Sequence, residues 1–112
     1  MMQVVFVVLH KTELLQDLLT KLKKAGVSGG TIIDSQGMIS YIQESDESYI
    51  LGSLRLFLEQ ARPDSKTMFF IIKDEQVDLV VETIDKALGG LENHNTGIAF
   101  AMPITRVEGV VK

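Results

Sequence analysis

The stretch MFFIIKDEQVDLVVETIDKALGG, residues 68–90, carries the pattern that decides the fold. Its first five residues are apolar, and their length and branched side chains favour a buried strand. Asp74 can then cap a helix, and Glu75 places a negative charge in the first turn. Gly89 and Gly90 end that helix. The spacing predicts a buried helix face made of Val77, Val80, Val81, Ile84, Ala87 and Leu88.

The same order of elements occurs earlier in the chain. Residues 4–9 are a continuous apolar run, which predicts a strand buried on both faces. Thr12 can cap a following helix, and Gly26 ends it. A short strand is predicted at 31–34, and a last strand at 98–104. The apolar positions of the first helix are Leu14, Leu15, Leu18, Leu19, Leu22 and Ala25.

Two β-α-β halves therefore follow each other, over about residues 3–34 and 66–104. This doubled unit predicts one α+β domain over 1–112, with a ferredoxin-like βαββαβ sandwich. Its four-stranded antiparallel sheet should carry both helices on one face. Pro103 lacks a backbone N–H, so the last strand should lie at an edge or bend there. The strands supply apolar side chains to the second face too, so we expect an oligomer to bury it.

A central insertion, residues 35–65, separates the halves and is too long for a hairpin turn. Its first part is polar and acidic, which is typical of a solvated loop. Its second part, YILGSLRLFLEQARP at 49–63, has apolar residues at helical spacing and predicts a short amphipathic helix. Such a helix is stable only when it packs on this sheet or on a neighbouring subunit.

Composition excludes several classes of protein. The chain has 112 residues, of which 46% are hydrophobic, and a formal net charge of −4. An acidic domain without a basic stripe is a poor nucleic-acid binder. No apolar run is long enough to span a bilayer, and the start has no signal-peptide pattern, so we expect neither an integral membrane protein nor a secreted one. The absence of cysteine is compatible with the cytoplasm, which is the expected location.

Signals for catalysis or metal binding are weak. The two histidines, His10 and His94, lie far apart and have no ligand spacing, and no nucleophile motif accompanies them. The acidic residues at 44–47 lack the glycine of a calcium-binding loop. We therefore predict no enzyme, no catalytic residue and no metal site.

The glycine-containing turns are better candidates for a ligand site. Gly26 and Gly89 are explained as helix ends, where the left-handed conformation favours glycine. Gly97 is explained less well, because it stands at the start of a strand after two polar residues. Asn95, Thr96 and Gly97 are therefore predicted to contact a ligand.

Three segments together resemble the PII-type nitrogen-regulatory signalling proteins: AGVSGGTIIDSQGM at 25–38, the stretch at 69–88, and TGIAFAMPITRV at 96–107. The resemblance covers nearly the whole chain except residues 40–65. It implies a trimer whose effector sites lie in clefts between subunits. Adenine nucleotides are the usual effectors, and the usual output is binding to a transporter or enzyme.

Gly37, with Met38 after it, falls at the base of the family's central loop. Gly97 and Phe100 match a glycine and an aromatic near the last strand.

This sequence departs from the family pattern where charge matters. Ile98 stands where the family places a lysine, and the basic residues expected beyond the last strand fall near Gly109 and Val111. No Lys or Arg lies between Lys86 and Arg106, so a triphosphate at this loop would meet few cations. We therefore predict a divergent PII-like regulator with altered or lost ATP binding. No cofactor is assigned with certainty; an adenine nucleotide or another small metabolite is the candidate.

The expected partners are two further copies of the chain and a transporter or enzyme that binds residues 38–62. Tyr41 and Tyr49 lie in that segment, but neither has the context of the family's modified tyrosine. Three alternatives remain open. A CutA-like trimer would bind divalent ions, a small dimeric α+β enzyme would use His10 as its acid or base, and a structural subunit would bind no small molecule.

Overall fold

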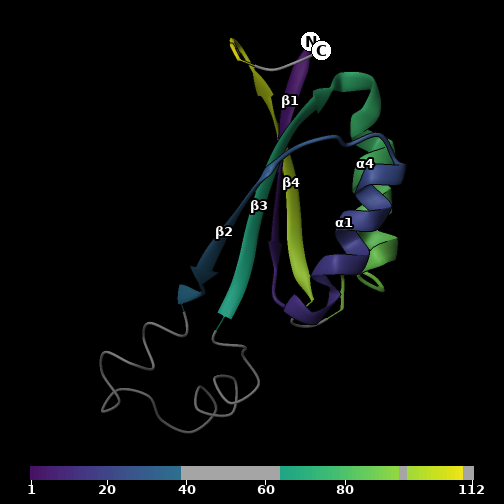
Figure 1. The fold of residues 1–112 in the computed structure, drawn as a ribbon, viewed down its shortest axis with the longest axis vertical. Helices are drawn as coiled ribbons and strands as arrows, with labels where there is room; N and C mark the ends of the chain where they lie inside the picture. Colours follow the sequence, from purple (N-terminus) through teal and green to yellow (C-terminus); the bar gives the residue numbers. More distant parts are fainter. Residues whose placement is uncertain (39–63, 94–95, 110–112) are drawn as a thin grey trace, which may run out of the picture.

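A computed structural model describes residues 1–38, 64–93 and 96–109. Its strands and helices follow one another in the order that the sequence predicts (Figure 1). A 3₁₀ turn precedes each helix. The elements are β1 (Met2–Leu9), η1 (Thr12–Leu14), α1 (Leu15–Lys24), β2 (Thr31–Gln36), β3 (Asp64–Lys73), η2 (Asp74–Gln76), α4 (Val77–Ala87) and β4 (Gly97–Ile104).

The strands form one four-stranded sheet in the order β2-β3-β1-β4, with every neighbouring pair antiparallel. Figure 1 shows α1 and α4 side by side against one face of this sheet. The predicted α+β, ferredoxin-like arrangement is therefore confirmed for the described residues. The edge position of β4 also agrees with Pro103, which cannot donate to a neighbouring strand. The short helix predicted at 49–63 lies outside the described residues.

The core fills the space between the helices and the sheet. Leu18 of α1 and Val80 and Ile84 of α4 are fully buried, as the helical spacing predicts. They pack on the strand residues that point the same way, since side chains alternate between the faces of a strand. The fully or nearly buried apolar residues of the strands are Val5, Val7, Leu9, Met68, Phe70 and Ile72.

Both helices begin differently from the prediction. Lys11 and Lys73 precede the two 3₁₀ turns, and neither Thr12 nor Asp74 caps a helix with its side chain. The Asp74 carboxylate instead accepts a hydrogen bond from Gln3 Nε2 at 3.0 Å and lies 3.7 Å from the N-terminal amine. Asp74 therefore ties the second half of the chain to β1, which local sequence does not reveal.

The strands also differ from the prediction in burial and length. In β1 only the helix-facing side chains are buried, whereas Val4, Phe6 and Val8 on the second face are half-buried. β2 continues through Gln36, and β3 begins at Asp64. Both ends of the predicted insertion at 35–65 thus belong to paired strands, because the β2–β3 ladder extends to its last pair, Gln36 with Asp64.

Candidate functional site

The segment between α4 and β4 begins as a tightly bonded turn. Gly89 and Gly90 have φ angles of 73° and 107°, a left-handed conformation that favours glycine. Asn93 Nδ2 donates to the Gly89 carbonyl at 2.6 Å, and the Leu91 N–H donates to Asp85 Oδ1 at 2.6 Å. These contacts complete the helix end, so the first part of the segment needs no ligand to explain it.

Thr96 is the described residue of this segment with an unexplained polar group. Its side chain is fully buried, and its Oγ1 has no hydrogen-bond partner among the described residues. Its carbonyl accepts hydrogen bonds from the N–H groups of His10 at 3.1 Å and Lys11 at 3.4 Å. A buried hydroxyl without a partner costs free energy, so Thr96 Oγ1 is a polar group that the described residues leave unsatisfied. Asn95 and His94 lie outside the described residues.

Gly97 has a structural explanation of its own. A Cβ placed there would come within 2.7 Å of the Val8 carbonyl oxygen, because β4 runs very close to β1 at this point. Glycine is therefore required by strand contact alone. The predicted role of Gly97 in ligand binding stays a prediction, and a substitution there would disturb the strands as well as any ligand.

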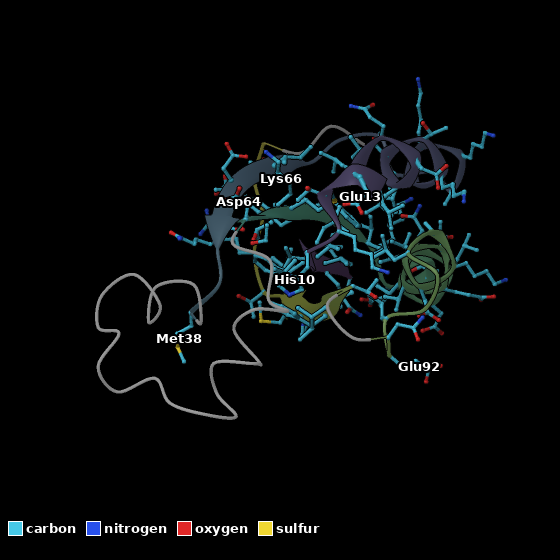
Figure 2. The ribbon with its side chains drawn as sticks, turned by 90° about the horizontal axis from the view of Figure 1, so that it is seen from below. His10, Glu13, Met38, Asp64, Lys66 and Glu92 are labelled. Atoms are coloured by element: carbon cyan, nitrogen blue, oxygen red, sulfur yellow. The ribbon has the colours of Figure 1, made fainter. Side chains whose placement is uncertain are left out.

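Gly37 and Met38 follow β2 at the base of the central segment. Gly37 has open space around it, and Met38 is 78% exposed. Figure 2 shows the Met38 side chain well away from the sheet and from His10, with Glu92 on the opposite side of the molecule.

These residues lie at the same end of the sheet as Thr96 and Gly97 but on the opposite edge. The register pairs Leu9 with both Lys66 and Gly97. It pairs Gln36 with Asp64, which precedes Lys66 by two residues in β3. Because β3 and β1 separate β2 from β4, the two edges are three strand spacings apart, roughly 14 Å. One copy of the chain thus does not bring the predicted site residues together.

Sequence reasoning missed the placement of Lys11 beside the predicted ligand loop. The only signal for it was the doubled fold, which brings the end of β1 next to the start of β4. The backbone N–H of Lys11 donates to the Thr96 carbonyl, so a basic residue follows β1 beside this loop, whereas Lys86 and Arg106 form ion pairs elsewhere. Lys86 lies 2.9 Å from Glu82, and Arg106 lies 2.8 Å from Glu108. The hydrogen bond that Lys86 donates to the Glu82 carboxylate, and then the negative charge of Glu82, raise the pKa of Lys86 above its usual value.

Three hydroxyl groups meet where β2 and β3 approach the central segment. Ser35 Oγ lies 2.8 Å from Ser65 Oγ and 2.7 Å from Thr67 Oγ1. Asp34 and Lys66 form an ion pair on the other face of the same strands. The hydroxyl groups satisfy one another, so they do not by themselves indicate a ligand.

The sheet face opposite the helices is apolar and partly exposed. Phe6 stacks on Phe100 with ring centroids 5.2 Å apart, and its ring centroid lies 5.6 Å from that of Phe69. Ile98, Phe100 and Met102 of β4 are 54%, 42% and 44% exposed. We call this surface, formed by the side chains of Val4, Phe6, Val8, Ile33, Phe69, Ile71, Ile98, Phe100 and Met102, the open face.

Neither a metal site nor a membrane span is found in the part of the chain that the structure describes. No group of three or more His, Cys, Asp or Glu side chains gathers there in a way that could hold a metal ion. None of the helices in these ranges has both the length and the apolar character needed to cross a bilayer.

Comparisons with known proteins agree with this fold. A crystal structure of Arabidopsis thaliana PII bound to citrate superposes with a TM-score of 0.63 over 92% of this chain and 77% of the plant chain, at 20% sequence identity. At that identity the likeness shows the fold. A comparison with curated protein sequences gave no significant match. The family model for nitrogen regulatory protein P-II matches residues 2–112, and the chain therefore belongs to the P-II family of regulatory proteins.

Proposed function

We propose that this protein is a P-II-type regulator that binds a small-molecule effector in clefts between copies of the chain. Residues 38–62 contact a protein partner, and this contact depends on whether the effector is bound. The proposal places the whole of 1–112 in one cytoplasmic domain that assembles as a homotrimer and catalyses no reaction. Membership of a family of regulatory proteins supports it.

The observation that carries the proposal is the separation of the predicted site residues. Gly37 and Met38 lie at one edge of the sheet, and Thr96 and Gly97 lie at the other, at the same end. Two copies placed edge to edge would complete a site that one copy leaves divided. The open face supplies the apolar surface that holds such copies together, since a monomer rarely exposes so large a patch.

Charge restricts the effector. Thr96 Oγ1 is a buried hydrogen-bonding group, and Lys11 is the basic residue whose backbone N–H meets the carbonyl of the same threonine. A triphosphate carries more charge than this set can neutralise. The effector is therefore smaller or less anionic than ATP. Because the plant PII structure holds citrate, a polycarboxylate belongs among the candidates with the adenine nucleotides.

Native mass spectrometry of the purified protein tests this proposal. The protein is measured alone and then with ATP, ADP, AMP and citrate in turn. A trimer that takes up one of these in as many as three copies is the expected result. A trimer that binds none of them would contradict the effector assignment, and a monomer or dimer would contradict the assembly.

Thr96→Val tests the site in the same assay. The substitution keeps the shape and removes the unpartnered hydroxyl, so the free energy of unfolding should stay the same or rise by about 1 kcal/mol. Effector uptake should fall about tenfold, as expected when one buried hydrogen bond is lost. Thr105→Val is the matched control, because Thr105 is exposed beyond β4 and should not affect binding. Equal uptake by Thr96→Val and the unmodified protein would remove Thr96 from the site.

A further inference from the structure

A separate cavity opens on the helix-facing side of the sheet. It has a volume of about 570 Å³ and lies between α1, the loop at 26–30, and strands β2 and β3. This volume falls in the range of roughly 300–1,000 Å³ that is typical of small-molecule sites. The apolar side chains that line it are Leu19, Leu22, Val27, Ile32, Met68 and Phe70.

The loop at 26–30 passes close to β3 at one side of this cavity. Gly29 and Gly30 lack side chains, and a Cβ at Gly30 would come within 2.9 Å of the Phe69 carbonyl oxygen. The loop therefore runs close against β3 without filling the space beside it. Ile32 pairs with Met68 and so points to the helix-facing side, yet it remains 45% exposed. An apolar side chain on this side of the sheet is thus left half-covered.

The mouth of the cavity carries unpaired positive and hydrogen-bonding groups. Lys23 lines it and has no acidic partner among the described residues, whereas Lys21 on the same helix lies 3.0 Å from Asp17. The N–H groups of Ser28 and Gly29 also have no acceptor within the described ranges. An apolar interior with a cation and amide donors at its rim matches a ligand with an apolar body and one negative group.

We propose that this cavity binds an apolar carboxylate such as a medium-chain fatty acid. The hydrocarbon chain lies against Leu19, Val27 and Ile32, the lining side chains that stay accessible, and the carboxylate accepts hydrogen bonds from Lys23 and the loop amides. The site is independent of the proposed effector cleft. It lies on the helix-facing side of β2, whereas Gly37 and Thr96 lie at the end of the sheet.

Titration of ¹⁵N-labelled protein with octanoate, followed through amide chemical shifts, tests the assignment. Saturable shifts should concentrate in residues 26–32, and octanol should bind more weakly than octanoate. Shifts that spread over β4, that fail to saturate, or that are absent would overturn the proposal. Equal binding of octanol would overturn the role of the charge.

Two substitutions test the apolar interior of the cavity and the positive charge at its rim separately. Ile32→Trp fills the cavity from an exposed strand position and should abolish binding.

Lys23→Glu should weaken octanoate binding about fivefold, which is the scale of an exposed ion pair. Lys24→Glu makes the same charge change on the same helix outside the lining and should leave binding unchanged. Equal effects of the two lysine variants would remove Lys23 from the site, and this readout holds even if Ile32→Trp does not fold.

Discussion

The two faces of the sheet have similar residues and very different burial. On the helix-facing side, Val5, Val7 and Leu9 are 0% exposed. On the open face, β1 offers Val4, Phe6 and Val8, which are equally apolar but only half-buried. The difference comes from what covers each face, since α1 and α4 lie on one side only (Figure 1). Apolar strand composition therefore shows that a face is to be buried, and the topology shows whether one chain can bury it.

The largest expected effect on the fold is at the covered face. Ile84→Ala removes a fully buried side chain and leaves a cavity, so it should lower the free energy of unfolding by about 2–5 kcal/mol. Ile98→Ala removes the same atoms from the open face, where the side chain is 54% exposed, and should cost less than about 1 kcal/mol in the isolated chain. Urea unfolding of both variants measures the contrast.

Measuring Ile84→Ala and Ile98→Ala at several protein concentrations also tests whether assembly covers the open face. A cost at Ile98 that grows with protein concentration would show that assembly covers the open face, because association stabilises the folded state by mass action. An equal cost at both positions, independent of concentration, would mean that one chain buries both faces.

An intermediate effect is expected where β4 meets β1. Gly97→Ala forces a Cβ toward the Val8 carbonyl and should destabilise the fold by about 1–3 kcal/mol. Gly29→Ala is the control, because its Cβ would meet nothing within 4 Å. Thermal unfolding of the two variants measures the difference. If Gly97→Ala were as stable as the control, the close contact between the two strands would be contradicted.

The smallest effect on the fold and the largest on assembly are expected at Phe100. Phe100→Glu places a charge on the open face, where Phe100 is already 42% exposed, so the isolated chain should change by about 0.5 kcal/mol or less. A buried charge between copies would be costly, so the mass measured by light scattering should fall to that of one chain. Leu79→Glu, on the exposed side of α4, is the matched control and should keep the assembly. A Phe100→Glu protein that keeps its full mass would show that the open face is not the interface.

Much of this architecture could be predicted because the signals are periodic. Helical spacing predicted the buried faces of α1 and α4, and the repeated β-α-β order predicted the topology. Apolar residues on both strand faces, with both helices expected on one side, correctly indicated that one chain leaves a second apolar face partly exposed. That an oligomer buries this face stays a prediction.

The site was harder to predict because its features depend on contacts between distant segments. Asp74 does not cap its helix, since Gln3 and the N-terminal amine bind it instead. The burial of Thr96 and the position of Lys11 beside it follow from pairing between the first and last strands. The cavity near Gly29 is lined by residues of α1, the loop at 26–30, β2 and β3, and no local apolar pattern shows that these segments meet.

The strand order also has a consequence for synthesis on the ribosome. β1 is a central strand, but its two neighbours are β3 and β4, which begin at Asp64 and Gly97. Of these four strands β1 is translated first, so it pairs only after the residues up to β3 have emerged, and such long-range pairing is slow. Until then an apolar strand is exposed in the nascent chain and is available to chaperones or to other nascent chains.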